Sequence, residues 1–468
     1  MLAASYYFYM CWNARYVLLI LFSTVVTYGS GLAIEWIKRN TADATRCAGR
    51  KKAVVAASFI LNLAILFYFK YCAFALDMLS ALLGRMHIAL SLPKVDVLLP
   101  VGISFYTFQA LSYTMDVYRD EIYAERDFFR YALFVSFFPQ LVAGPIERSK
   151  NLLRQLATPR SFDVGGAREG LLLMLWGFFL KIVLADRIAV FVDTVYGSFQ
   201  TYTGWYLIVA TMLFAVQIYC DFYGYSVIAA GAAKMLGVTL MDNFNAPYLS
   251  VSIAQFWRNW HISLTTWFRD YLYIPLGGSR KGELRKQFNR MIVFTVSGLW
   301  HGASLAFVAW GALNGLYQVL GDVLRPLRDW FVARFHLNRR SLGHRLAQMA
   351  CTFVLVDISW VFFRANRLTD ALKILSSIVL ADNPWILVDG SLYTCGLNSA
   401  NFSLMLICIV VLLASDICRR KGISIRRVIM EQDAWFRFLT ILFAVCAILT
   451  FGKWGGVYNA ASFIYFQF

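Results

Sequence analysis

The sequence predicts an all-α, polytopic integral membrane protein, and three observations lead to this fold class. Hydrophobic residues make up 59% of the 468 residues and charged residues 15%, whereas a soluble protein has roughly 25% charged residues. The apolar residues form continuous runs, many close to the ~20 residues that a spanning helix needs, and they do not alternate as in a membrane barrel. The basic residues cluster in short segments between these runs, which is typical of a multi-pass membrane protein.

Seven apolar runs are good candidates for membrane-spanning helices, and two more are less uniform. The seven runs cover residues 14–34, 53–76, 170–190, 205–233, 346–363, 402–415 and 438–451, and the two weaker ones cover 98–117 and 128–145. Pro139 interrupts the last of these, because proline breaks the hydrogen bonding of a helix interior.

Residues 291–321 form a run of 31 residues without a formal charge. This run is too long for one untilted span and too short for two spans with a loop, which predicts a kinked or re-entrant helix pair. Glycines at positions 298, 302, 311 and 315 would allow close approach of two helices there.

The basic clusters predict the orientation of the chain in the membrane. By the positive-inside rule we place the four richest clusters in the cytoplasm: residues 38–52, 280–290, 325–345 and 419–427. The number of spans between them then puts residues 460–468 on the outer side. The net charge of +17 also suggests nucleic-acid binding, but the basic residues do not lie on a soluble module, so we expect no nucleic-acid partner.

The stretch 252–273 has the length of a helix and an unusual composition for a membrane protein. It carries several tryptophans and tyrosines together with charged residues, His261 among them. Such a helix is too polar to face lipid. We expect it either in the membrane interface, with arginines extending to water, or buried beside a wet cavity.

Two of the five histidines are candidate functional residues. His87, His336 and His344 lie in loops, but His301 lies inside the uncharged run, where an ionisable side chain is costly and marks a functional site. His261 precedes it by 40 residues. Two imidazoles at one cavity suit general-base chemistry near neutral pH, although either could be a structural, hydrogen-bonded histidine. Without a paired Glu or Cys at ligand spacing, they do not predict a metal site.

Other polar residues within apolar runs are Gln140, Gln217, Asp221 and Asp357, and for each a structural role is favoured. The sequence contains no P-loop, no GxSxG elbow, no HExxH and no dinucleotide-binding glycine fingerprint, which argues against ATP-driven transport, serine hydrolysis and zinc proteolysis. The residues alone leave two classes open: a membrane enzyme with a histidine base, or a carrier with a histidine-lined path.

Several long motifs resemble the membrane-bound O-acyltransferase superfamily, and in particular its bacterial branch typified by alginate O-acetylase. The main ones are FWRNWHISL at 256–264, WFRDYLYIPLGG at 267–278 and GLWHG at 298–302. Supporting segments lie at 99–109, 138–146, 242–249 and 360–365. The resemblance runs from about residue 5 to beyond 364, with residues 99–365 the richest in motifs.

The resemblance implies a multi-helix bundle around a central tunnel, with re-entrant or interfacial helices, formed by one acyltransferase domain over residues 1–468. Relatives usually begin with a further hydrophobic helix, so the resemblance also implies that a first family helix is missing before residue 1. His301 would be the catalytic base, and His261 would share the proton work or support the acyl site. Residues expected to line the tunnel are Trp300, Trp257, Trp260, Asn259, Arg258, Asp270, Gln140 and Asp221.

The implied activity is transfer of an acyl group, in the first place acetyl, from a cytoplasmic thioester to hydroxyls of an extracytoplasmic polysaccharide such as alginate. The donor would be acetyl-CoA or another acyl thioester, with no bound cofactor and no metal. Expected partners are the polysaccharide, a separate extracytoplasmic glycan acyltransferase and the lipid of the bacterial inner membrane. Alternatives are O-acetylation of peptidoglycan, D-alanyl transfer to teichoic acid and, outside the enzymes, an acyl-group exporter.

The sequence departs from the family pattern at two positions within the motifs. Asn314 stands where relatives often have a histidine, so we expect no third histidine in the site. Val227 stands where relatives often have an aspartate, so no acidic role is expected there.

Overall fold

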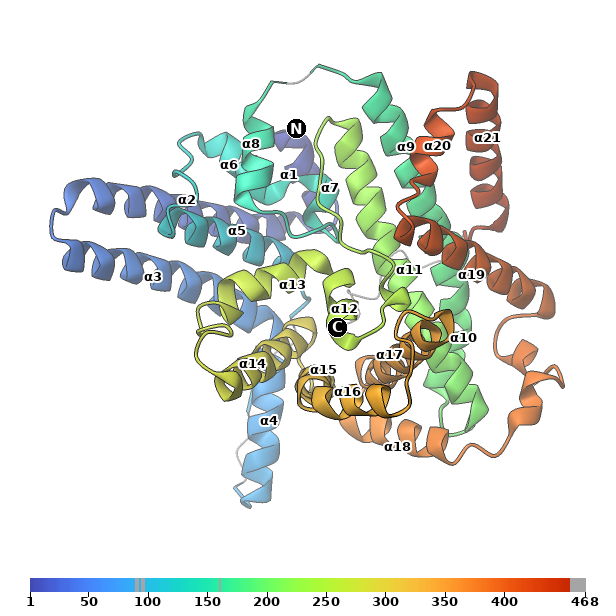
Figure 1. Ribbon diagram of the computed structural model, residues 1–468. Helices are drawn as coiled ribbons and strands as arrows, with labels where there is room; N and C mark the ends of the chain where they lie inside the picture. Colours follow the sequence, from blue (N-terminus) through green and yellow to red (C-terminus); the bar gives the residue numbers. More distant parts are fainter. Residues whose placement is uncertain (89–91, 94–96, 160, 455–468) are drawn as a thin grey trace. The chain divides into compact units, whose positions relative to one another are not determined.

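The computed structural model describes residues 1–88, 92–93, 97–159 and 161–454, and every regular element in this part of the chain is helical (Figure 1). The all-α prediction is therefore confirmed. Six helical stretches are long and apolar enough to cross a membrane, and each overlaps one of the seven predicted spans. They are Ala14–Asn40, Ala44–Lys70, Trp205–Met235, Leu342–Arg364, Ser399–Arg420 and Ala434–Phe451.

The seventh predicted span, residues 170–190, is helical but divided. Helix α9 (Val164–Phe178) passes into a π-helical segment, η2 (Phe179–Ala185), and then into α10 (Asp186–Gly197). A π-helical insertion changes the hydrogen-bond register of a helix and often marks a functional or strained position. Here it brings the buried Lys181 within 2.7 Å of Asp186 and 2.6 Å of Asp221.

The contacts divide the chain into two compact units. Unit 1 comprises residues 1–167 and 232–241, and unit 2 comprises residues 168–231 and 242–468. That residues 1–468 act as a single acyltransferase domain stays a prediction.

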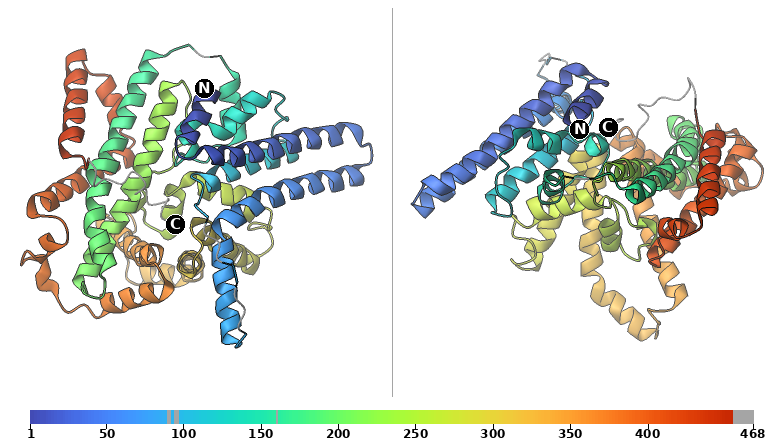
Figure 2. Two further views of the ribbon diagram at one scale, coloured as in Figure 1. Left: turned by 180° about the vertical axis from the view of Figure 1, so that it is seen from behind. Right: turned by 90° about the horizontal axis from the view of Figure 1, so that it is seen from above.

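Unit 1 contains the N-terminal helices. They are α1 (Leu2–Met10), η1 (Ala14–Tyr16), α2 (Val17–Asn40), α3 (Ala44–Lys70), α4 (Cys72–Arg85), α5 (Ile103–Tyr118), α6 (Phe128–Ser136), α7 (Phe138–Leu141) and α8 (Ser149–Ala157). Helices α2 and α3 form a long hairpin, side by side in Figure 1 and when seen from behind in Figure 2. The weaker predicted span at 128–145 is broken as expected, because α6 ends at Ser136 and Pro139 lies in the first turn of α7.

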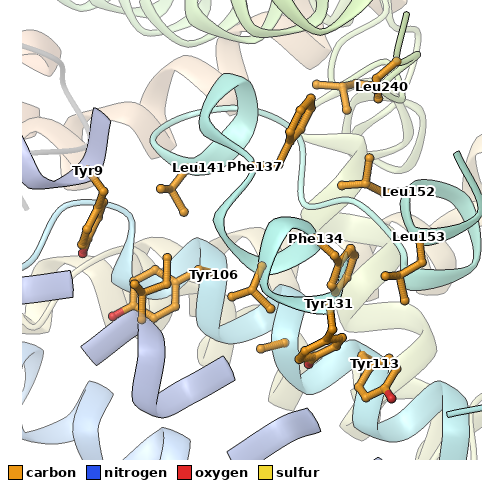
Figure 3. Close-up of a cluster of buried hydrophobic side chains, with 14 of the residues drawn as sticks. Tyr9, Tyr106, Tyr113, Tyr131, Phe134, Phe137, Leu141, Leu152, Leu153 and Leu240 are labelled. Atoms are coloured by element: carbon orange, nitrogen blue, oxygen red, sulfur yellow. The ribbon is translucent and has the colours of Figure 1, made fainter. Parts of the chain in front are cut away.

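The core of unit 1 is rich in tyrosine (Figure 3). The rings of Tyr113 and Tyr131 lie 4.4 Å apart between centroids, and the Tyr131 hydroxyl donates a 2.7 Å hydrogen bond to Thr27 of α2. Such a bond satisfies a polar group that would otherwise be costly to bury in a membrane protein.

Unit 2 contains α10, most of α9 and α11, and the C-terminal helices. Those not yet named are α11 (Trp205–Met235), η3 (Pro247–Leu249), α12 (Ile253–Asn259), α13 (Ile262–Phe268), η4 (Arg269–Tyr273), α14 (Glu283–His301), α15 (Leu305–Val323), α16 (Arg325–Arg334), α17 (Leu342–Arg364), α18 (Leu368–Val379), η5 (Pro384–Leu387), η6 (Ser391–Thr394), α19 (Ser399–Arg420), α20 (Ile425–Met430) and α21 (Ala434–Phe451). Residues 460–468, which we placed on the outer side, lie outside the described residues.

The uncharged run forms the helix pair that its length predicted. Helix α14 ends at His301, α15 begins at Leu305, and the two pack against each other along their length. Their backbones meet at Gly298 and Gly311, where a Cβ atom on either residue would collide with a backbone carbonyl of the other helix. The glycines thus permit the close approach expected from the sequence.

The expectation of one helix over residues 252–273 is wrong. Helix α12 ends at Asn259, and α13 begins only at Ile262, because His261 adopts the left-handed backbone conformation, with φ 42° and ψ 56°. The backbone groups released at this break are hydrogen-bonded to a distant loop: Ile262 donates to the Asn243 carbonyl, and Asn245 donates to the Asn259 carbonyl. These bonds come from residues remote in the sequence, so helical periodicity could not reveal them.

Candidate functional site

His301 is the last residue of α14 and is enclosed by aromatic side chains from three helices. Its ring centroid lies 5.0 Å from that of Trp300, 5.0 Å from Trp310 of α15 and 5.5 Å from Phe363 of α17. Only 4% of the residue is exposed. Its position follows from the helix end, since Gly302 leaves the helical conformation and a side chain there would collide with the Phe307 ring.

His261 lies beside His301 although 40 residues separate them in the sequence. The two imidazole centroids are 6.3 Å apart, and His261 is 6.0 Å from Trp300. The ring of Phe222, from α11, lies 4.6 Å from the His261 ring between centroids and nearly perpendicular to it. The structure therefore brings together the two histidines and the tryptophan that the sequence singled out.

A polar cluster holds His261 at the break between α12 and α13. Its Nδ1 lies 3.1 Å from Oδ1 of Asn243, and the same oxygen accepts hydrogen bonds from the backbone N–H and the hydroxyl of Ser263. His261 is 1% exposed, and burial lowers its pKa to about 3. The imidazole is therefore neutral at physiological pH, the form that can accept a proton or a hydrogen bond.

A cavity of about 1480 Å³ opens beside His261 within unit 2. Helices α12 to α17 contribute to its wall, and Trp257, Leu264 and Phe268 lie with His261 among its lining residues. Among the described residues His261 lines this cavity and His301 does not. The tunnel with His301 on its wall stays a prediction.

The lining of this cavity combines apolar side chains with an excess of positive charge. Its acidic residues are Asp322 and Asp329. Its arginines are Arg258, Arg269, Arg290, Arg325, Arg328 and Arg339. Asp322 pairs with Arg290 at 2.5 Å and with Arg325 at 2.7 Å, which leaves a net positive wall suited to an anionic ligand.

Among the other residues expected to line a tunnel, Trp257 and Arg258 line this cavity, and three more are not among its described lining residues. Trp260 is buried in an aromatic cluster, stacked on Phe256 at 5.4 Å. Asn259 donates to the Ser250 hydroxyl at 3.1 Å, and Asp270 pairs with its neighbour Arg269 at 2.8 Å.

The two remaining residues of that prediction have partners elsewhere. Gln140 belongs to unit 1, where its side chain donates to Gln109 at 2.9 Å. Asp221 is buried in unit 2 and forms an ion pair with Lys181. Both contacts agree with the structural role that the sequence favoured, and a part in a tunnel stays a prediction for each.

The two departures from the family pattern have a structural basis. Asn314 is fully buried, accepts a 3.3 Å hydrogen bond from the Trp257 indole and donates to the Trp310 carbonyl at 2.9 Å, so it supports two tryptophans of the site. Val227 is buried, and a Cβ on Gly177 would lie 2.9 Å from its Cγ2 atom, which places an apolar side chain at the α9–α11 contact.

Four residues that shape the site were not predicted from the sequence. Trp310 and Phe363 enclose His301, while Asn243 and Ser263 hold His261. All but Trp310 lie in the motif segments at 242–249, 256–264 and 360–365. A polar residue within such a segment is the signal that could have pointed to Asn243.

Comparisons with known proteins agree with this architecture. The model of the membrane-bound O-acyltransferase family matches residues 118–354. A "probable alginate O-acetylase" of Pseudomonas syringae pv. tomato is 36% identical over 370 residues, which cover 79% of this chain and 67% of the relative. The corresponding protein of Azotobacter vinelandii is 34% identical over 414 residues, which cover 88% and 78%.

A third relative has a different acceptor in its name. The peptidoglycan O-acetyltransferase of Helicobacter pylori is 32% identical over 404 residues, which cover 80% of this chain and 72% of the relative. The family model spans half of the chain, and the motif segments that hold both histidines lie inside the matched region. The chain therefore belongs to the membrane-bound O-acyltransferase family.

Proposed function

We propose that this O-acyltransferase transfers an acetyl group from a cytoplasmic thioester toward hydroxyls of an extracytoplasmic polysaccharide, with His301 as the general base. The observation that carries the proposal is the pair of buried imidazoles 6.3 Å apart beside a positively charged cavity, in a chain of this family. The relatives named as alginate O-acetylases support an exopolysaccharide of the alginate type as acceptor.

In the proposed reaction one proton moves from the acceptor hydroxyl to His301 and then from His301 to the leaving thiolate. The hydroxyl oxygen attacks the carbonyl carbon of the thioester, a C–O bond forms and the C–S bond breaks. His301 takes the hydroxyl proton as the attack proceeds and returns it to the thiolate, so the products are an ester and a thiol. The aromatic residues around His301 exclude water, which limits competing hydrolysis of the thioester.

The charged cavity supports a donor that carries phosphate groups. Acetyl-CoA has phosphates at one end and an acyl thioester at the other, so the arginines would bind the phosphates while the thioester points toward His261. Arg258 and Arg328 line the cavity, and among the described residues no ion pair with an acidic side chain involves either of them, which favours them as phosphate ligands. His261 would support the acyl group or share the proton transfer.

The first test of the proposal is His301→Ala in the full-length protein. We expect ester formation to fall by about 10²–10⁴-fold, the usual effect of losing a general base, while the protein still inserts and purifies. The matched control is His336→Ala, which removes an exposed histidine of a basic loop and should retain activity. Near-wild-type ester content on the glycans of cells producing His301→Ala would contradict the assignment.

A second experiment separates the enzyme from an acyl exporter. The purified enzyme in detergent should consume acetyl-CoA in the presence of a soluble hydroxyl acceptor. An exporter would show turnover only in sealed vesicles, because it moves the group without chemistry. Alkali-labile acetate on exopolysaccharide supports the proposed acceptor, whereas acetate on peptidoglycan or D-alanine on teichoic acid would favour those alternatives.

The membrane orientation can be tested in the same cells. We propose that the protein resides in the bacterial inner membrane and passes the group to a separate extracytoplasmic glycan acyltransferase. Single cysteines introduced into the four basic clusters should escape impermeant thiol reagents in intact cells, and labelling of any one would overturn the orientation. The clusters are residues 38–52, 280–290, 325–345 and 419–427.

A further inference from the structure

We propose that Asn243 is a positioning residue that fixes His261 in the Nδ1–H tautomer and leaves Nε2 as the lone-pair nitrogen of the ring. The assignment stands on hydrogen-bond geometry alone. Only its meaning for catalysis rests on the proposed acyl transfer, because a neutral imidazole with a fixed lone pair can accept a hydrogen bond or a proton from a bound hydroxyl.

The orientation of the Asn243 amide follows from an unambiguous donor. The backbone N–H of Ser263 can only donate, and the Asn243 atom 3.3 Å from it must therefore be the carbonyl oxygen Oδ1. The Ser263 hydroxyl reaches the same atom at 2.9 Å. On the other side of the amide, Nδ2 donates to the Ser226 hydroxyl of α11 at 3.1 Å. Turning the amide over would set two N–H groups against each other at Ser263.

The orientation of the amide then determines the tautomer of His261. Oδ1 has no proton to give, so the ring nitrogen 3.1 Å from it must carry the hydrogen for the contact to be attractive. A bare Nδ1 would place two lone pairs against each other in a buried site. The Ser263 hydroxyl, 3.4 Å from Nδ1, is already the donor of a shorter bond to Oδ1, so it does not supply an alternative proton for Nδ1. In a neutral imidazole the remaining nitrogen, Nε2, is the acceptor.

The position of Asn243 is itself fixed by its backbone. Its carbonyl accepts a 2.9 Å hydrogen bond from the N–H of Ile262, the first residue of α13. Asn243 thus satisfies the first two free N–H groups of α13, at Ile262 and Ser263, in place of a side-chain cap, which His261 does not provide. The Asn243 residue is therefore held against the start of α13, beside the His261 ring that its side chain orients.

An amide suits this position better than a carboxylate would. An aspartate at 243 would attract a proton to the imidazole, because an opposite charge close to a histidine raises its pKa. His301 lies 6.3 Å from His261 between ring centroids, and a positive charge on His261 would oppose proton uptake by His301. A neutral partner keeps His261 neutral while still fixing its orientation, in agreement with the effect of burial on its pKa.

The test is the ¹⁵N spectrum of histidine-labelled full-length protein in lipid. The chain has five histidines, and converting His87, His336 and His344 to Gln leaves the two site residues, which His261→Gln then assigns. In this background we expect His261 to show a protonated Nδ1 and an unprotonated Nε2 at neutral pH. A protonated Nε2 with a bare Nδ1 would overturn the proposal before any variant of Asn243 is made.

Two substitutions then examine Asn243 directly. Asn243→Leu removes the acceptor, and we expect loss of the single Nδ1–H signal; persistence of that signal would show that Asn243 is not the positioning residue. Asn243→Asp keeps the acceptor oxygen, so His261 should still show the Nδ1–H signal in this variant, which serves as the test if the leucine variant does not fold. A change of His261 to Nε2–H in Asn243→Asp would refute the inference. Asn289→Leu is the matched control, because Asn289 is equally buried but bonds to the Leu276 and Gly278 carbonyls. None of these spectra requires turnover, so their outcome is separate from that of the acyl-transfer assay.

Discussion

Gly298→Ala should both weaken the α14–α15 helix pair and impair the site, because the two helices touch through their backbones at this residue. A Cβ atom at position 298 would collide with the carbonyl of Phe307 and lie 3.2 Å from the Cα of Gly311. Both obstacles are backbone atoms, so no side-chain rotation can relieve them. The Phe307 oxygen is the nearest obstacle and would lie more than about 1 Å inside the usual contact distance of about 3.5–4.0 Å, so the helices must separate by roughly 1 Å.

The expected magnitude follows from two opposing effects. Forcing an extra methyl group into a packed contact costs about 1–3 kcal/mol, while alanine gains about 0.5–1 kcal/mol over glycine inside a helix. The net effect is therefore a loss of stability of up to about 2.5 kcal/mol. His301 lies three residues further along α14, about 4.5 Å along the axis, so the same separation displaces its ring from Trp310 of α15. A misplacement of about 1 Å can reduce turnover by about 10²-fold.

Thermal unfolding in detergent and acetyl ester formation measure the two effects. Gly29→Ala is the control, because Gly29 lies inside α2, outside the cavity lining, and no atom lies within 4 Å of a Cβ built there. We expect that variant to be as stable as the wild type or up to about 1 kcal/mol more stable, with full activity. If Gly298→Ala behaves like Gly29→Ala in both assays, the close glycine contact does not position His301 and the reasoning fails.

Three further substitutions probe charges elsewhere in the fold. Lys181→Met leaves the buried Asp186 and Asp221 without their shared cation, and we expect the free energy of unfolding in detergent to fall by about 3–5 kcal/mol. Replacing both aspartates by Asn in the same variant should restore most of this stability, and no recovery would refute the pairing argument. Hydrogen bonds from the lysine and arginine of α14 hold the pKa of Asp322 below its usual value although burial opposes them. Asp322 therefore stabilises the folded protein above about pH 4, and this stabilisation is lost as pH falls. Asp322→Asn should be less stable than the wild type at pH 7, and the two proteins should have the same stability in acid. Burial raises the pKa of Glu147, so the ionised carboxylate destabilises the folded protein as pH rises through the pKa of the folded state. Glu147→Gln should therefore be more stable than the wild type at pH 7, and the difference in stability should vanish near pH 4. A difference that stays constant with pH would contradict this prediction.

Features that depend on neighbouring residues could be read from the sequence. Continuous apolar runs of spanning length predicted the helical class, which the structure confirms, and six of these runs form helices long and apolar enough to cross a membrane. A helix is the expected structure for such a run, because it satisfies its backbone hydrogen bonds internally when it is buried in lipid. The length of the uncharged run predicted the α14–α15 pair, and its one imidazole singled out His301. Each of these conclusions needs only composition and spacing within a single segment.

Features that depend on distant partners were decided by the tertiary structure. Nothing local to residues 252–273 indicates that the helix breaks at His261, because the groups that stabilise the break belong to Asn243 and Asn245. Likewise, Asp221 could not be classed as structural or catalytic until folding placed Lys181 beside it. A hydrogen bond or ion pair is worth making only between groups that packing has brought within about 3 Å. The sequence therefore singled out His301 and His261 as candidate functional residues, and the packing of α11, α13 and the loop at Asn243 determined how His261 is held.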